Sequence, residues 1–92
     1  MVRFFSVNYS VVVDVTLREG IADPEGATIE RALPALGFNG VVDVKAGKSF
    51  RMTIDAESED EALGRARALA ERLLSNPVIE DATARLSEAH AS

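Results

Sequence analysis

The chain contains no cysteine and a single histidine, His90, in its polar C-terminal stretch. Disulfides, thiolate nucleophiles and cysteine-ligated metals are therefore excluded, and His90 is expected to be solvated rather than catalytic. Aromatic residues make up only 5% of the 92 residues although apolar residues make up 47%, so the core must consist of Val, Leu, Ile and Ala. No apolar run approaches the ~18 residues of a membrane span, and the opening residues lack a signal-peptide pattern. We expect a cytoplasmic protein.

Basic residues are also scarce. Ten Lys and Arg face fifteen Asp and Glu, which gives a formal net charge of −5. Nucleic acid is a disfavoured partner, because affinity for its phosphates depends on clustered cations. A chain of this length is expected to form one domain, 1–92, with 1–9 as an N-terminal extension and 87–92 as a frayed tail. A domain this small buries only about 60–65% of its unfolded surface, so self-association is expected to help it.

Hydrophobic periodicity predicts six elements. Strict alternation predicts a strand over 10–18, and Asp23-Pro24 is a typical N-cap and first helical residue for a helix over 24–36. Pro34 should kink or tighten the end of that helix, and Gly37 should end it. Ser58 and Glu61 form a capping box that opens a second helix, which Asn76-Pro77 stops. The remaining alternating segments predict strands over 41–46, 50–55 and 79–86.

The two middle strands are expected to form a hairpin. Ala46 opposite Phe50 and Val44 opposite Met52 would place their apolar side chains on one face, which leaves Gly47-Lys48-Ser49 as the turn. One long strand with a bulge at Gly47 is the alternative. The order predicts an α+β fold, a β-α-β-β-α-β split βαβ (ferredoxin-like) two-layer sandwich whose antiparallel sheet carries both helices on one face. The other face, which is half apolar, would remain open to a partner.

The residues present argue against several functions that short segments of the sequence suggest. Gly47-Lys48-Ser49 ends like a P-loop, but the required glycine five residues earlier is Val42, and no helix follows. An RNA-recognition surface needs several aromatics on its strands, whereas the candidate segment "KAGKSFRM" has only Phe50, which is expected to point to the core. An acylphosphatase-like site has only Arg18-Glu19-Gly20 and Asn39 to offer, without a glycine-rich cradle. The acidic residues 57–61 are expected to be a solvated helix start. No catalytic, cofactor-binding or metal-ligating residue is therefore assigned.

Three segments of the sequence resemble one family. They are "VVVDVTLREGIADPEGATIERALPALGF", "VVDVKAGKSF" and "ERLLSNPVIEDATARL", and the similarity runs from about Ser10 to Leu86. The spaced combination of "DPEG", "LGF", "DVKAGK" and "LLSNPVIED" is specific, although each piece alone would be weak. This combination resembles the PurS subunit of phosphoribosylformylglycinamidine (FGAM) synthase, an enzyme of purine biosynthesis.

The resemblance implies a non-catalytic subunit of an ATP- and glutamine-dependent ligase. Such a subunit would form a homodimer or homotetramer and would join a glutaminase subunit (PurQ) to a synthetase subunit (PurL), supporting ammonia transfer between them. ATP, Mg and glutamine would be used by the complex and not bound by this chain. A free-standing ACT-like domain that binds a small molecule is the alternative. Two contact surfaces are hypothesised, one around the expected turn and one around the helix stop; their residues are Lys45, Gly47, Lys48, Arg51, Asn76 and Ile79.

Overall fold

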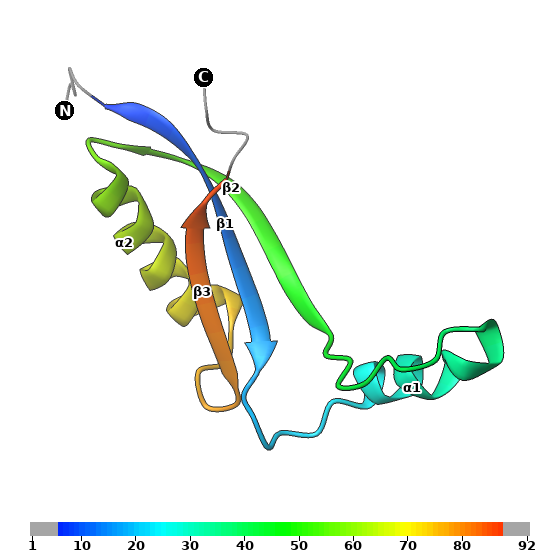
Figure 1. Ribbon diagram of the computed structural model, residues 1–92. Helices are drawn as coiled ribbons and strands as arrows, with labels where there is room; N and C mark the ends of the chain where they lie inside the picture. Colours follow the sequence, from blue (N-terminus) through cyan, green and yellow to red (C-terminus); the bar gives the residue numbers. More distant parts are fainter. Residues whose placement is uncertain (1–5, 88–92) are drawn as a thin grey trace.

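A computed structural model describes residues 6–87 of the chain. Its centre is a three-stranded antiparallel sheet of β1 (Val7–Leu17), β2 (Gly47–Ala56) and β3 (Glu80–Leu86), with β1 in the middle. Helix α2 (Glu59–Leu69), continued by a wide π-helical turn, η2 (Ala70–Leu74), covers one face of this sheet (Figure 1). None of the helices in the described part of the chain is long and apolar enough to cross a bilayer.

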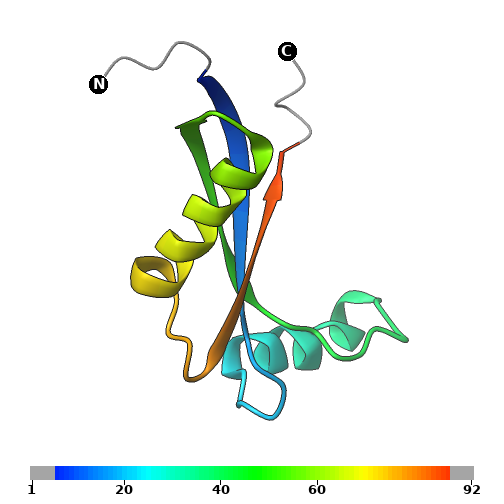
Figure 2. The ribbon, with the colours of Figure 1, turned by 90° about the vertical axis from the view of Figure 1, so that its left-hand side faces the viewer.

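The connection between β1 and β2 lies outside this sandwich. It contains α1 (Pro24–Ala32), a 3-10 turn, η1 (Pro34–Leu36), and an extended return segment. We call the whole connection, residues 18–46, the arm; Figures 1 and 2 show it projecting from the lower end of the sheet in both views. The radius of gyration of 17.3 Å reflects this shape, since a compact chain of this length would have about 12 Å.

The core lies between β1 and α2. Val11, Val13 and Val15 are at most 1% exposed and face the helix, because alternate residues of a strand share a side. Ala62, Ala66 and Ala70 recur every fourth residue on the helix and are equally buried. Their small side chains let the helix backbone approach the sheet, and each fully buried valine contributes roughly 1.5–3 kcal/mol. Of the Val, Leu, Ile and Ala that the sequence predicts for the core, Val and Ala supply the fully buried residues, whereas Ile54, Leu63, Leu74 and Leu86 are only partly buried.

The expected fourth strand is absent from the described residues. The order is β-α-β-α-β, and residues 41–46 form no ladder. The hairpin prediction is wrong, because Gly47-Lys48-Ser49 begins β2 and pairs with Thr16, Val15 and Asp14 instead of turning. The eleven-residue β1 reaches far enough to offer backbone partners to all three. The α+β class, the antiparallel sheet and the placing of α2 on one face are confirmed, whereas α1 does not lie on that face.

Predictions about the ends of the helices were more accurate. The Asp23 side chain caps α1 with Pro24 at its first position, and Ser58 Oγ accepts from the Glu61 N–H at 3.1 Å. The turn after Pro34 is tightened into a 3-10 helix that ends at Gly37, where φ is 90°. Residues 7–9 of the expected N-terminal extension belong to β1. Residues 1–5 of that extension, most of the expected tail and His90 lie outside the described residues.

Candidate functional site

Four of the six candidate residues border one end of the sheet. Gly47 and Lys48 open β2, where they pair with Thr16 and Val15 at the end of β1. Glu80 opens β3 opposite Leu17, and its carboxylate lies 3.9 Å from the Lys48 ammonium. Asn76 and Ile79 stand in the turn that leads into β3. We call this region the basal end; it is also the end from which the arm projects (Figure 1).

The turn at Asn76 is built by its own hydrogen bonds. The Asn76 carbonyl accepts from the N–H groups of Ile79 and Glu80, and its side-chain oxygen accepts from the Val78 N–H at 3.1 Å. In return, the Glu80 carboxylate accepts from the Asn76 N–H at 2.7 Å. The Arg18 N–H donates to the Ile79 carbonyl at 2.8 Å, which ties the turn to the start of the arm. Val78 is 81% exposed at the tip of this turn, so the loop presents an apolar side chain on a fixed backbone.

Arg51 lies apart from the other candidates. It is an odd number of residues from Lys48 along β2, so the two side chains project from opposite faces of the sheet. On the open face Arg51 and Arg85 flank Val12, which is only 3% exposed despite facing away from α2. Arg85 pairs with the Asp14 carboxylate at 3.5 Å. The single polar surface expected around Lys45, Lys48 and Arg51 is therefore divided between two faces.

Asp23 ties the two sides of the arm together. One of its carboxylate oxygens accepts from the Gly26 N–H and caps α1, and the other accepts from the Ala46 N–H, each at 2.9 Å. These two hydrogen bonds lower the pKa of the Asp23 carboxyl below its usual 3.8, and the positive charge of Lys45 adds to the effect. The ionised carboxylate therefore holds the return segment against the start of α1 immediately before it enters β2.

A second carboxylate repeats this link further along the helix. Glu30 Oε1 accepts from the Val44 N–H at 3.0 Å. Between the two links the backbone passes so close to α1 that a Cβ on Gly26 would collide with the Val44 carbonyl oxygen. Gly47 has a similar role at the basal end, since a Cβ there would lie 2.7 Å from the Val15 carbonyl oxygen. The "DPEG" and "DVKAGK" segments are therefore two halves of one contact.

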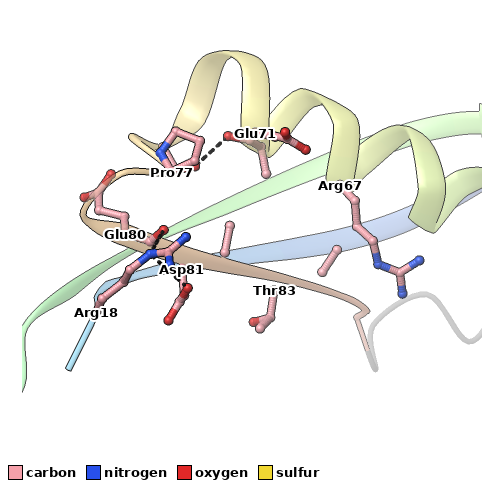
Figure 3. Close-up of a pocket in the computed structure, with 11 residues that line it drawn as sticks. Arg18, Arg67, Glu71, Pro77, Glu80, Asp81 and Thr83 are labelled. Carbon is pink, nitrogen blue, oxygen red and sulfur yellow. Dashed lines mark hydrogen bonds and ion pairs between the residues drawn. The ribbon is translucent and has the colours of Figure 1, made fainter.

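A cavity of about 340 Å³ lies between the end of α2 and β3 (Figure 3). Its charged residues include Arg18, Glu80 and Asp81 at one end, Arg67 at the other, and Glu71 on the helix side (Figure 3). Arg18 is already engaged, because its Nε lies 3.4 Å from both the Asp81 carboxylate and the Glu80 carbonyl. Neither this cavity nor the other one lined by Arg18 includes Asn39, so the acylphosphatase-like pair is not assembled.

The described residues hold no recognisable catalytic constellation. Within 6–87 no three carboxylate or histidine side chains gather in a way that could hold a metal ion. The geometry provides a basal end held by hydrogen bonds, an open sheet face and a projecting arm. Sequence reasoning treated Asp23 only as a helix cap and missed its bond to Ala46. The available signal was the presence of both "DPEG" and "DVKAGK" in the chain.

Known proteins of one family are similar to this chain over most of its length. The family model described as PurS: Phosphoribosylformylglycinamidine (FGAM) synthase matches residues 10–88. The PurS subunit of Mycobacterium leprae is 47% identical over 72 residues, which are 78% of this chain and 87% of that one. The subunit of Methanocaldococcus jannaschii is 38% identical over 73 residues, 79% of this chain and 88% of that one.

Solved structures give the same result. The Thermotoga maritima PurS subunit superposes with a TM-score of 0.82 at 32% identity and covers 89% of this chain and 94% of its own. A chain of the Thermotoga maritima PurLQS structure gives a TM-score of 0.81 at 32% identity, covering 88% of this chain and 99% of that one. The protein belongs to the PurS family, the family of the PurS subunit of FGAM synthase in purine biosynthesis.

Proposed function

We propose that this chain is the small non-catalytic subunit that joins the glutaminase subunit (PurQ) to the ATP-dependent synthetase subunit (PurL) of FGAM synthase. The observation that carries the proposal is the similarity to a chain of the PurLQS structure, which extends over 88% of this protein at a TM-score of 0.81.

Ammonia transfer gives such a subunit its physical purpose. Ammonia released from glutamine at one active site must reach the other before it is diluted and protonated in water. A module that fixes two active sites beside each other raises the effective concentration of the transferred molecule without chemistry of its own. We propose that this chain itself binds no ATP, Mg or glutamine. We also propose that it has no nucleic-acid or membrane partner and works in the cytoplasm.

The proposed contacts fall on two surfaces that point in different directions. Lys48, Asn76 and Ile79 belong to the basal end, beside the exposed Val78. Arg51 belongs to the open sheet face, where no ion pair with it is recorded among the described residues. A cation at the rim of an interface affects the association of the subunits more than the folding stability of the chain that carries it. Each surface can therefore be tested by reversing one charge. Lys48 and Arg51 are suitable for comparison because they project from opposite faces of the sheet.

The experiment measures assembly of the three purified subunits by analytical ultracentrifugation, with Lys48→Glu and Arg51→Glu compared against the parent chain. If the basal end meets a partner, Lys48→Glu weakens assembly by roughly tenfold or more while Arg51→Glu changes it little; the reverse result assigns the open face. Unchanged assembly with both variants would contradict the proposed contact residues. Failure of the parent chain to assemble at all would contradict the proposed bridging role.

We also propose that the chain self-associates as a homodimer or homotetramer. The support is its elongated shape and the large apolar side chains that it leaves in water on the arm.

A further inference from the structure

The outer edge of β3 has no strand partner in the described chain, because β3 pairs only with β1. At one end of this pairing the Ser87 N–H donates to the Ser10 carbonyl at 2.8 Å. At the other end the Arg18 N–H donates to the Ile79 carbonyl at the same distance. In an antiparallel pair, residues bonded to the neighbouring strand alternate with residues whose backbone groups point away from it. The odd-numbered residues of β3 are therefore bonded to β1, and the even-numbered ones direct their N–H and C=O groups outward.

Ala82 and Ala84 are the outward-directed residues in the middle of this edge. Ala82 and the adjacent Thr83 are exposed. Folded proteins usually protect a strand edge with charged side chains, with proline or with a covering loop. The stretch Ala82-Thr83-Ala84 carries neither a charge nor a proline. Its free N–H and C=O groups can therefore accept the backbone of one more strand.

The cavity of about 340 Å³ lies along the same edge. Ala82, Thr83 and Ala84 all line it, and no described residue of β1 or β2 does. A hollow on one face of a sheet would be lined by alternate residues of a strand, so this cavity lies beside the strand, between its edge and the end of α2 (Figure 3). On the helix side, the N–H and the hydroxyl of Ser75 both donate to the Ala70 carbonyl at 2.9 Å, which closes the wide turn η2.

The lining of the cavity indicates what an added strand would carry. Ala82 and Ala84 face α2 with methyl groups only, so the space between strand and helix can take large apolar side chains from alternate residues of that strand. Within the described residues Arg67 has no ion pair, whereas Arg18 lies against the Asp81 carboxylate. A carboxylate on the added strand would therefore complement Arg67. A second copy that paired its own β3 here would bring only two further alanines and would leave the cavity unfilled.

We propose that an extended segment of one of the two subunits joined by this chain adds to the outer edge of β3 as a fourth strand. Two large apolar side chains of that segment, two residues apart, enter the cavity, and a carboxylate pairs with Arg67. This inference rests on the proposed bridging function and deepens it. Main-chain hydrogen bonds supply affinity in such strand addition, and the alternate side chains supply specificity. The cavity shares Arg18, Pro77 and Glu80 with the basal end, so the segment would extend the contact surface proposed there.

Hydrogen exchange of the chain, alone and mixed with the two purified partner subunits, tests the added strand directly. The amides of Ala82 and Ala84 should exchange rapidly in the chain alone and at least ~10-fold more slowly in the complex. The amides of Thr83 and Arg85 donate to β1 and should be protected in both samples. A mere side-chain contact would not produce this alternation.

Three other results are distinguishable. Rapid exchange of Ala82 and Ala84 in an assembled complex would overturn the strand addition and leave the bridging role standing. Protection of these amides in the chain alone that rises with its own concentration would show that a second copy covers the edge, and would also overturn it. A failure of the three subunits to assemble would contradict the bridging role, and this inference with it.

Substitutions on β3 provide a second test by analytical ultracentrifugation. Ala82→Pro removes an N–H that points away from β1, so the sheet keeps its own bonds while the added strand loses one. Ala82→Leu fills the cavity from within. Each should raise the dissociation constant of the assembly at least ~10-fold. Ala68→Leu is the matched control, because Ala68 is exposed on α2 and does not line the cavity; it should change the constant less than ~3-fold.

The charge of the groove is tested in the same way. Arg67→Glu should raise the dissociation constant by roughly tenfold. Arg72→Glu is its control, because Arg72 is exposed near the same end of the helix and does not line the cavity. Assembly of Ala82→Leu and Arg67→Glu with the affinity of the parent chain would overturn the proposal. Equal losses in the two control variants would overturn it as well.

Discussion

The carboxylate of Asp23 holds the backbone N–H of Ala46, 23 residues further along the chain, at 2.9 Å. This bond joins the start of α1 to the last residue before β2. It therefore links the part of the arm that follows β1 to the part that enters β2. It also explains why "DPEG" and "DVKAGK" occur together. The aspartate accepts from both segments, and Gly26 lets Val44 pass close to the helix.

Replacing Asp23 should loosen the arm in a pH-dependent way. Because the folded pKa of Asp23 lies below its unfolded value of 3.8, the ionised group stabilises the arm above that pH, and this contribution is lost as the pH falls through the folded pKa. Hydrogen exchange should show weaker protection of the Ala46 amide in Asp23→Asn than in the parent at pH 6. The difference should shrink below pH 3.8, since the substituted asparagine does not titrate.

Asp43→Asn is the matched control for this experiment. Asp43 is exposed, has a left-handed φ of 59°, and can be replaced by an asparagine, which tolerates that conformation. It should leave the protection of Ala46 unchanged. Equal protection in the parent and Asp23→Asn at pH 6 would show that the carboxylate does not hold the return segment.

Two glycine-to-alanine substitutions on helices should have opposite effects. Gly26→Ala places a methyl group against the Val44 carbonyl oxygen and 2.7 Å from Asp23 Oδ2, so the amides of Val44 and Ala46 should lose protection from exchange. Gly64→Ala on α2 meets nothing within 4 Å and should raise the free energy of unfolding by about 0.5–1 kcal/mol in urea titrations. Both substitutions gain the same helix propensity. If Gly64→Ala also lowered the protection of the Val44 and Ala46 amides, the steric explanation would be wrong.

The centre of the sheet should be the most sensitive part of the core. Val13 is fully buried between α2 and both neighbouring strands, and Val13→Ala should lower the free energy of unfolding by about 2–3 kcal/mol. Val78→Ala, at a residue that is 81% exposed, makes the same chemical change in water and should cost under ~0.5 kcal/mol. Equal urea midpoints for the two variants would contradict the assignment of the core.

Local signals in the sequence predicted the local structure well. Alternation over 10–18 identified the buried valines of β1, and the caps at Asp23 and Ser58 located the helix starts. The prediction failed where tertiary pairing decides the outcome. Residues 41–46 alternate like a strand, yet Val44 and Ala46 donate to Glu30 and Asp23 instead of to another strand. Glycine at position 47 suits a turn or a close approach to Val15 equally, and periodicity cannot distinguish these uses.

The candidate site was predictable only in part. The sequence indicated which polar residues flank the middle of the chain and the end of α2, and the fold brings Lys48 near Glu80 at the basal end beside the Asn76 turn. It did not indicate that Lys48 and Arg51 face opposite ways, because the predicted turn left the orientation of Lys48 undefined. Once Gly47 to Ala56 form one strand, the odd spacing of the two residues fixes their faces.

The central claim is that this chain lets glutamine-derived ammonia reach the synthetase. The most direct measurement is FGAM synthase activity of the purified glutaminase and synthetase subunits, with and without this chain, using either glutamine or an ammonium salt as the nitrogen source. The account predicts that adding the chain restores the glutamine-driven rate while the ammonium-driven rate changes little. A glutamine-driven rate that is the same in the presence and absence of the chain would contradict it.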